Sequence, residues 1–87
     1  MFVTIYGRLS CPYCVRAKNL AEKLKNAVEN FDYRYIDIIK QGMTKEDIAK
    51  IIGKPVHTVP QVLIDDKSIG GCTDFEALMQ EQFPDIA

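Results

Sequence analysis

The feature that most restricts the fold of this chain is a strand–helix–strand pattern in its first 39 residues. Residues 2–6 are a short β-branched and aromatic run that ends at Gly7, which predicts a buried strand. From Pro12 onward, apolar residues recur at steps of three and four, as on one face of an amphipathic helix. Residues 31–39 then begin with strict alternation and predict a second strand. A helix between two strands indicates a βαβ unit, which implies parallel pairing of the strands with a right-handed crossover.

The rest of the chain predicts two more helices and two more strands. Thr44 resembles the start of a helix and Gly53 its end. Residues 59–64 predict a third strand, and residues 68–69 predict a short fourth strand after a turn.

The last helix is predicted to begin at a capping box and to end before Pro84. In this box Thr73 is the cap and Glu76 lies three residues later. The predicted element order is therefore β-α-β-α-β-β-α, an α/β fold with a mixed sheet and helices on both faces.

Charge and hydropathy exclude several classes of protein. With 11 Lys and Arg against 12 Asp and Glu, the net charge of −1 gives no general attraction for nucleic acid or an anionic membrane. No apolar run approaches the ~20 residues of a membrane-spanning helix, and Met1–Tyr6 lacks the basic region of a signal peptide. We therefore expect a single cytoplasmic domain spanning residues 1–87.

A Cys-Pro-Tyr-Cys motif at residues 11–14 lies where the loop after the first strand enters the first helix. Residues three apart on a helix share a face, at a distance that a disulfide tolerates. Cys11 lies at or beside the cap, where the helix dipole, free N–H groups and Arg8 favour a thiolate. Cys14 lies one turn inside the helix. We therefore predict that Cys11 is the attacking nucleophile and Cys14 the resolving thiol.

Two structural uses of the cysteines compete with this redox prediction. Cys72 and His57 could join the pair in a zinc site of three cysteines and one histidine, although structural zinc ligands usually come as two pairs. An inert disulfide across so short a loop would add little stability, and cytosolic thiols are normally kept reduced. The spacing favours a redox pair and no metal.

Three motifs in this order resemble the glutaredoxin family over essentially the whole chain. They are the Cys-x-x-Cys pair, Thr58-Val59-Pro60, and Gly70-Gly71 followed by Thr73-Asp74. Within the family, the resemblance is to the small dithiol type of bacteria that can serve as hydrogen donor to ribonucleotide reductase. It implies a thioredoxin-like fold, a four-stranded mixed β-sheet flanked by three helices.

The resemblance also implies the activity and its partners. The chain would be an enzyme, a glutathione-dependent thiol–disulfide oxidoreductase that reduces protein disulfides and glutathione mixed disulfides. Glutathione would be its co-substrate, with no tightly bound cofactor. Its partners would be disulfide-containing proteins, ribonucleotide reductase among them, and it would act as a monomer.

A glutathione site beside the cysteine pair follows from the same resemblance. The backbone of Val59, next to a cis bond to Pro60, would pair with the cysteinyl part of glutathione. Thr73 and Asp74 would bind its γ-glutamyl end, and Arg8 its glycyl carboxylate. The complete set of implied binding residues is Arg8, Tyr13, Thr58, Val59, Pro60, Gly71, Cys72, Thr73 and Asp74.

Several alternatives stay open. Cys72 stands where a larger side chain is expected in close relatives, and it is either a buried, inert thiol or an exposed one open to oxidation. A thioredoxin-type reductase fed by a flavoprotein is a second function, against which Thr73-Asp74 after the double glycine argues. An iron–sulfur or zinc carrier is a third, which Pro12 disfavours by family analogy.

Overall fold

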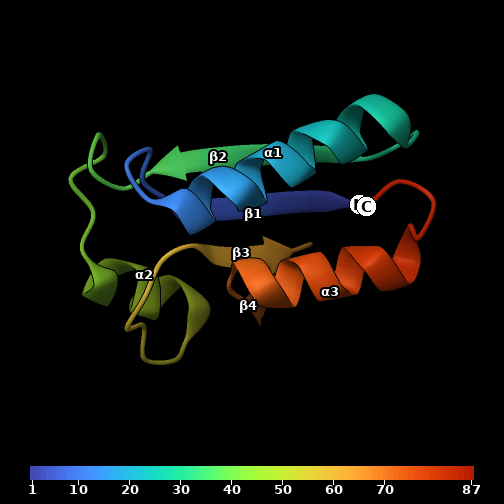
Figure 1. The fold of residues 1–87 in the computed structure, drawn as a ribbon. Coiled ribbons are helices and arrows are strands. Elements are labelled where there is room, and N and C mark those ends of the chain that lie inside the picture. Colours follow the sequence, from blue (N-terminus) through green and yellow to red (C-terminus); the bar gives the residue numbers. More distant parts are fainter.

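The computed structural model describes all residues from 1 to 87. Its elements follow the predicted order (Figure 1). They are β1 (Phe2–Gly7), α1 (Pro12–Ala27), β2 (Asp32–Asp37), α2 (Lys45–Ile52), β3 (Gln61–Ile64), β4 (Lys67–Gly70) and α3 (Cys72–Gln82). No helix is both long and apolar enough to cross a membrane.

The four strands form one mixed sheet in the order β2-β1-β3-β4. Strands β1 and β2 pair in parallel, from Phe2 opposite Asp32 to Gly7 opposite Asp37, so the predicted crossover unit is confirmed. The other two pairings are antiparallel. This four-stranded mixed sheet with three helices is the fold class expected from the sequence.

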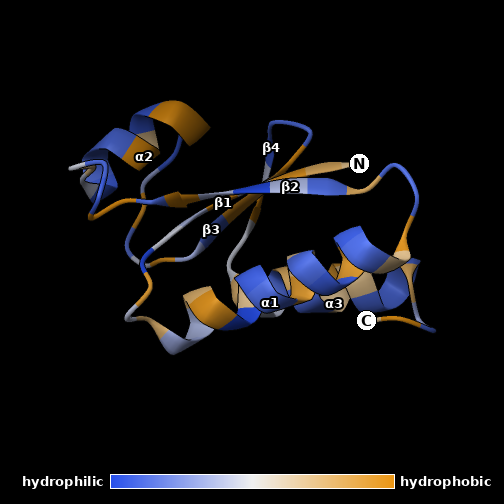
Figure 2. Cartoon of the chain, turned by 90° about the horizontal axis from the view of Figure 1, so that it is seen from above, coloured by the Kyte–Doolittle hydropathy of each residue, from blue (hydrophilic) through white to orange (hydrophobic).

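Helices cover both faces of the sheet, and Figure 2 shows α1 and α3 together on one face with α2 on the other. Alternate side chains of β1 explain this arrangement, because successive residues of a strand point to opposite faces. Val3 and Ile5 are fully buried in the core shared with α1 and α3. Tyr6 belongs to a smaller core that includes Ile48 of α2. A strand buried on both faces fits its near-continuous apolar sequence.

Helix α2 begins and ends as predicted. The Thr44 hydroxyl accepts a hydrogen bond from the Asp47 N–H at 3.2 Å, and the Asp47 carboxylate accepts one from the Thr44 N–H at 2.8 Å. Gly53 ends the helix with a φ of +78°, in the left-handed region that glycine adopts without a steric penalty.

The predicted start of α3 is wrong by two residues. Gly71, and not Thr73, is the cap, and its N–H donates to the Asp74 carboxylate at 3.1 Å. The positive φ of Gly70, +113°, turns the chain early enough for the helix to begin at Cys72. Glu76 is therefore free of any capping role.

The strands on either side of α2 are shorter than predicted. Strand β2 ends at Asp37, where the side chain accepts hydrogen bonds from the N–H groups of Ile39 and Lys40 and starts a turn. Strand β3 begins only at Gln61, because Val59 and Pro60 remain in the preceding loop.

Candidate active site

Cys11 occupies the N-cap of α1, as the motif predicted. Its backbone is extended, with φ −96° and ψ 119°, and its side chain makes no capping hydrogen bond. Pro12 fills the first helical position, where no N–H is required. The half-buried thiol points at the backbone carbonyl of Val59, with 3.8 Å between Sγ and the oxygen. All three cysteines are free thiols.

The surroundings of Cys11 favour its thiolate. Partial burial opposes ionisation, but the Cys14 thiol and the N–H groups of Cys14 and Tyr13, which can donate to a sulfur anion, outweigh it. The positive charge of Arg8 acts in the same direction, so the pKa of Cys11 lies below its ordinary value. Because the thiolate is the nucleophilic form of cysteine, these surroundings favour Cys11 as the attacking sulfur.

Cys14 has the opposite environment. Its side chain is fully buried, and this burial, reinforced by the adjacent Cys11, raises the pKa of Cys14 to about 11. The two pKa values therefore differ in the predicted order. The assignment of Cys11 to attack and Cys14 to resolution stays a prediction.

A hollow of about 340 Å³ lies beside Cys11 and contains almost the whole predicted binding set. Its lining residues are Tyr13, Thr58, Val59, Pro60, Gly71, Cys72, Thr73 and Asp74. They come from the start of α1, the loop before β3 and the first turn of α3. The Val59–Pro60 peptide bond is cis, as the resemblance implied.

Arg8 is the one predicted binding residue outside this hollow. It is exposed in the loop after β1 and affects Cys11 through its charge. A β-carbon added at Gly71 would lie 3.5 Å from the Pro60 carbonyl oxygen, an ordinary contact, so the protein itself leaves space there. At Gly70 the added atom would overlap the Asp74 carboxylate.

Cys72 is a buried thiol in the wall of the hollow. It is 4% exposed, and burial, together with the nearby Glu76, raises its pKa. Of the two states expected for Cys72, the structure places it in the buried one, where the raised pKa disfavours its thiolate.

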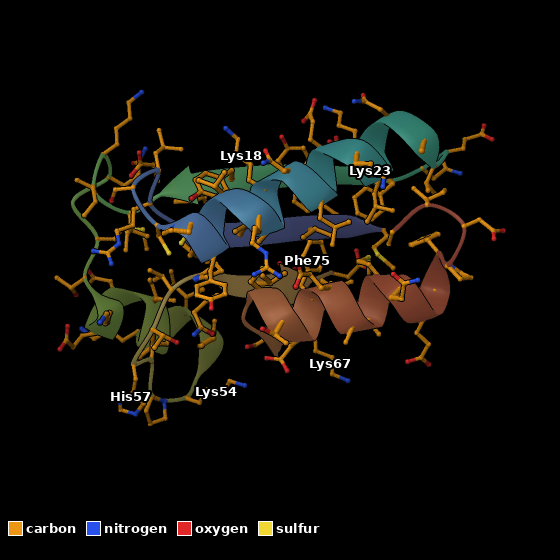
Figure 3. All side chains as sticks on the ribbon, viewed as in Figure 1. Lys18, Lys23, Lys54, His57, Lys67 and Phe75 are labelled. Carbon is orange, nitrogen blue, oxygen red and sulfur yellow. The ribbon has the colours of Figure 1, made fainter.

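The four residues considered as zinc ligands do not form a cluster. No group of three or more His, Cys, Asp or Glu side chains is arranged to hold a metal ion. His57 is exposed, and Figure 3 shows it at the outer edge of the loop after α2.

Comparison with known proteins assigns the family. The sequence profile described as Glutaredoxin matches residues 3–69. The chain belongs to the glutaredoxin family. It is 70% identical over 87 residues to the glutaredoxin of Haemophilus influenzae, with all of both chains covered. It is 62% identical over 81 residues to glutaredoxin 1 of Salmonella typhimurium, covering 93% of each chain.

A solved structure agrees with this assignment. The reduced glutaredoxin of Escherichia coli matches with a TM-score of 0.86 and 54% identity, over 97% of this chain and 99% of that one. The fold is therefore thioredoxin-like, and the chain is a small dithiol glutaredoxin with the thiol–disulfide oxidoreductase activity of its family.

Sequence reasoning missed a contact that shapes the wall of the hollow in this glutaredoxin. The Arg16 guanidinium donates from Nη2 to both carboxylate oxygens of Glu76, at 2.7 and 2.9 Å, and joins α1 to α3. The same guanidinium lies 5.3 Å from the centre of the Tyr13 ring. The i, i+3 spacing of Tyr13 and Arg16 could have indicated this stacking. The role of Glu76 had no sequence signal, because 60 residues separate it from Arg16.

A larger depression of about 960 Å³ runs along the side of β2, but no cysteine lines it. Its volume therefore does not identify the reactive site. The smaller hollow is lined by Val59, whose carbonyl contacts the Cys11 thiol, so this hollow is the candidate substrate site.

Proposed function

We propose that the chain reduces protein disulfides and glutathione mixed disulfides with glutathione as its co-substrate. The observation that carries this proposal is the hollow beside Cys11, whose lining includes eight residues, all in the predicted binding set. Taken singly, each of these residues has a structural explanation. Their convergence on one side of an activated sulfur favours a bound tripeptide thiol.

The backbone of Val59 is suited to hold the cysteinyl part of glutathione. Its N–H makes no hydrogen bond within the chain, and its carbonyl receives only the long contact from the Cys11 thiol. An extended ligand can therefore pair with both groups as a one-residue strand would. This pairing would place the ligand sulfur beside Cys11.

The γ-glutamyl end of glutathione carries a carboxylate and an ammonium group. The free N–H groups at the start of α3 fit the carboxylate. Asp74 accepts the Gly71 N–H through one oxygen, which leaves its other oxygen to accept from the ammonium. Arg8 lies outside the hollow, so its pairing with the glycyl carboxylate would be made at the outer end of the ligand.

The proposed reaction begins when the Cys11 thiolate attacks a disulfide. With a glutathionylated protein, Cys11 attacks the glutathione sulfur, the protein leaves as a thiolate, and a second glutathione thiolate then releases glutathione disulfide and regenerates Cys11. With a protein disulfide, Cys11 forms a mixed disulfide. Cys14 then attacks Cys11, expels the protein thiolate and leaves a Cys11–Cys14 disulfide, which two glutathione molecules reduce.

We also propose the setting of this reaction. It requires a reservoir of reduced glutathione, such as the cytoplasm provides. We further propose, from the family resemblance, that the chain acts as a single domain and a monomer. Ribonucleotide reductase is the specific partner proposed, from the resemblance to the small dithiol type. The test is whether the reduced protein and glutathione sustain turnover of that reductase.

Two cysteine variants test the central proposal with a small glutathione mixed disulfide as substrate. Cys11→Ser should abolish glutathione-dependent reduction, whereas Cys14→Ser should retain it, because the monothiol route needs only Cys11. The opposite pattern would contradict the proposal. Turnover supported by a flavoprotein reductase in the absence of glutathione would instead identify a thioredoxin-type reductase.

A further inference from the structure

Strand β2 carries a buried hydroxyl that the proposed reaction does not yet use. The Tyr35 side chain is half-buried, but its hydroxyl oxygen is inaccessible to water and has no hydrogen-bond partner. Tyr33, two residues earlier on the same strand, differs because its hydroxyl donates to Glu22. Buried polar groups are nearly always paired, so the unpaired hydroxyl of Tyr35 needs an explanation.

The position of Gly7 shows what this hydroxyl faces. A β-carbon added at Gly7 would lie 2.7 Å from the Tyr35 hydroxyl oxygen and 2.9 Å from the Cys14 sulfur. Both atoms therefore converge on the space that this glycine leaves open. The hydroxyl is a donor without an acceptor, and the nearest reactive group is the resolving thiol.

We propose that Tyr35 is a positioning residue for the resolving step, in which its O–H donates a hydrogen bond to the Cys14 sulfur as that sulfur becomes a thiolate. This inference rests on the proposed function. The Cys14 thiolate attacks Cys11 in the mixed disulfide, the Cys11–Cys14 bond forms, and the bond from Cys11 to the partner sulfur breaks. The departing partner thiolate takes up, through solvent, the proton that Cys14 released. Tyr35 keeps its own proton throughout.

The need for such a donor follows from the burial of Cys14. With a pKa of about 11, only roughly one Cys14 in ten thousand is ionised at pH 7. Burial dominates this pKa, and the nearby Tyr35 hydroxyl, which can donate to a sulfur anion, is among the influences that lower it. Burial likewise raises the pKa of Tyr35, so its hydroxyl stays protonated and able to donate.

The other charged or titratable groups around this pair are few. Cys11 adjoins Cys14, and the backbone of Arg8 contacts its sulfur. The Lys18 ammonium lies 5.4 Å from the centre of the Tyr35 ring, and Asp37 lies at the end of β2. Among these groups, Tyr35 is the neutral side-chain donor aimed at Cys14 from the sheet.

Tyr35→Phe removes only the hydroxyl oxygen, and Tyr33→Phe is the matched control on the same strand. The measurement is the rate at which Cys14 displaces glutathione from a preformed Cys11–glutathione disulfide, followed across pH. Because a hydrogen bond to a charged group is worth roughly tenfold to a hundredfold in an equilibrium, Tyr35→Phe should slow this step by about that factor. Its pH midpoint should rise, and Tyr33→Phe should change neither value.

Two further readouts separate this role from a purely structural one. In a Cys14→Ser background, Tyr35→Phe should leave monothiol turnover unchanged. The reduced Tyr35→Phe protein should also be at least as stable as the parent, because the substitution removes an unpaired buried hydroxyl. Unchanged resolution kinetics in Tyr35→Phe, or an equal loss of monothiol and dithiol turnover, would overturn the inference. Failure of the proposed function would appear differently, as no glutathione-dependent turnover by the Cys14→Ser protein.

Discussion

At the scale of single residues, the reactivity of this glutaredoxin follows from how differently two sulfur atoms are surrounded. Cys11 is half-buried at a helix end whose donor groups favour its thiolate, whereas Cys14 is enclosed beneath it. The two cysteines are three residues apart along the helix, and this separation is enough for the pKa of Cys11 to be lowered and that of Cys14 to be raised. The sequence motif predicts this order, because it places one cysteine at the helix end and the other a turn inside.

The charge of Arg8 should contribute measurably to this difference. Arg8→Ala removes a cation that lowers the pKa of Cys11, so the midpoint of Cys11 alkylation against pH should move upward. Arg34→Ala is the control, because this exposed arginine lies over the Phe2 ring on another part of the sheet and should leave the midpoint in place. Equal midpoints for the parent and Arg8→Ala would contradict an electrostatic role for Arg8.

The residues that sequence reasoning missed act through contacts between distant segments. The Tyr35 hydroxyl approaches Cys14 only because β2 lies beside β1, where Gly7 leaves space for both side chains. In the sequence, Tyr35 is one apolar position of an alternating strand. Local pattern shows the face of a strand on which a residue lies, but it does not show which atom is opposite.

At the scale of elements, the first turn of α3 joins the fold to the candidate site. Gly70 turns the chain, Gly71 caps the helix, and Asp74 closes the cap. The predicted capping box at Thr73 and Glu76 matched the residue types that such boxes use. It was wrong because the positive φ of a glycine, which the sequence does not display, started the helix earlier.

The two adjacent glycines should respond differently to alanine. Gly70→Ala places a β-carbon against the Asp74 carboxylate at a φ of +113°, and should lower the free energy of unfolding by about 1–3 kcal/mol. Gly71→Ala meets only an ordinary contact with Pro60, and should keep stability within about 1 kcal/mol while weakening glutathione binding. Denaturant titration and calorimetry with glutathione measure the two effects. Equal losses of stability would contradict this division of roles.

At the scale of the whole molecule, the element order and the parallel crossover followed from hydrophobic periodicity. The grouping of residues around the hollow was predicted from the family resemblance. Sequence spacing alone did not link the loop before β3 to the first turn of α3. Strand ends and helix caps were less predictable, because turns at Asp37, Pro60 and Gly70 decide them. Periodicity reports buried faces, whereas boundaries depend on single backbone conformations.

Burial of Cys14 also makes the stability of the reduced protein depend on pH. The unfolded chain ionises Cys14 near its ordinary pKa of 9.0, whereas the folded chain retains the proton until about pH 11. The stability that Cys14 contributes is therefore present below pH 9 and lost as the pH rises from 9 toward 11. The lowered pKa of Cys11 has the opposite sign, because its contribution is lost as the pH falls through the folded-state value.

Replacing Cys14 should reduce this alkaline loss. Urea unfolding under reducing conditions should show the parent losing about 1–3 kcal/mol more than Cys14→Ala across this alkaline range. The raised pKa of Tyr33 does not depend on Cys14, so its contribution cancels in the comparison, whereas the pKa of Tyr35 is raised in part by Cys14 and belongs to the difference. If the unfolding free energies of the two proteins fell in parallel with pH, Cys14 would not be the source of the alkaline loss.

The uncapped N-terminus of α1 couples folding to electron transfer. A thiolate at Cys11 supplies negative charge to that helix end, whereas a Cys11–Cys14 disulfide withdraws it. In a thermodynamic cycle, whatever free energy stabilises the reduced chain over the oxidised one appears as a higher reduction potential, with ~30 mV for each 1.4 kcal/mol. In the proposed reaction, a helix that lacks a capping side chain would thereby set part of the oxidising power of the disulfide formed at its end.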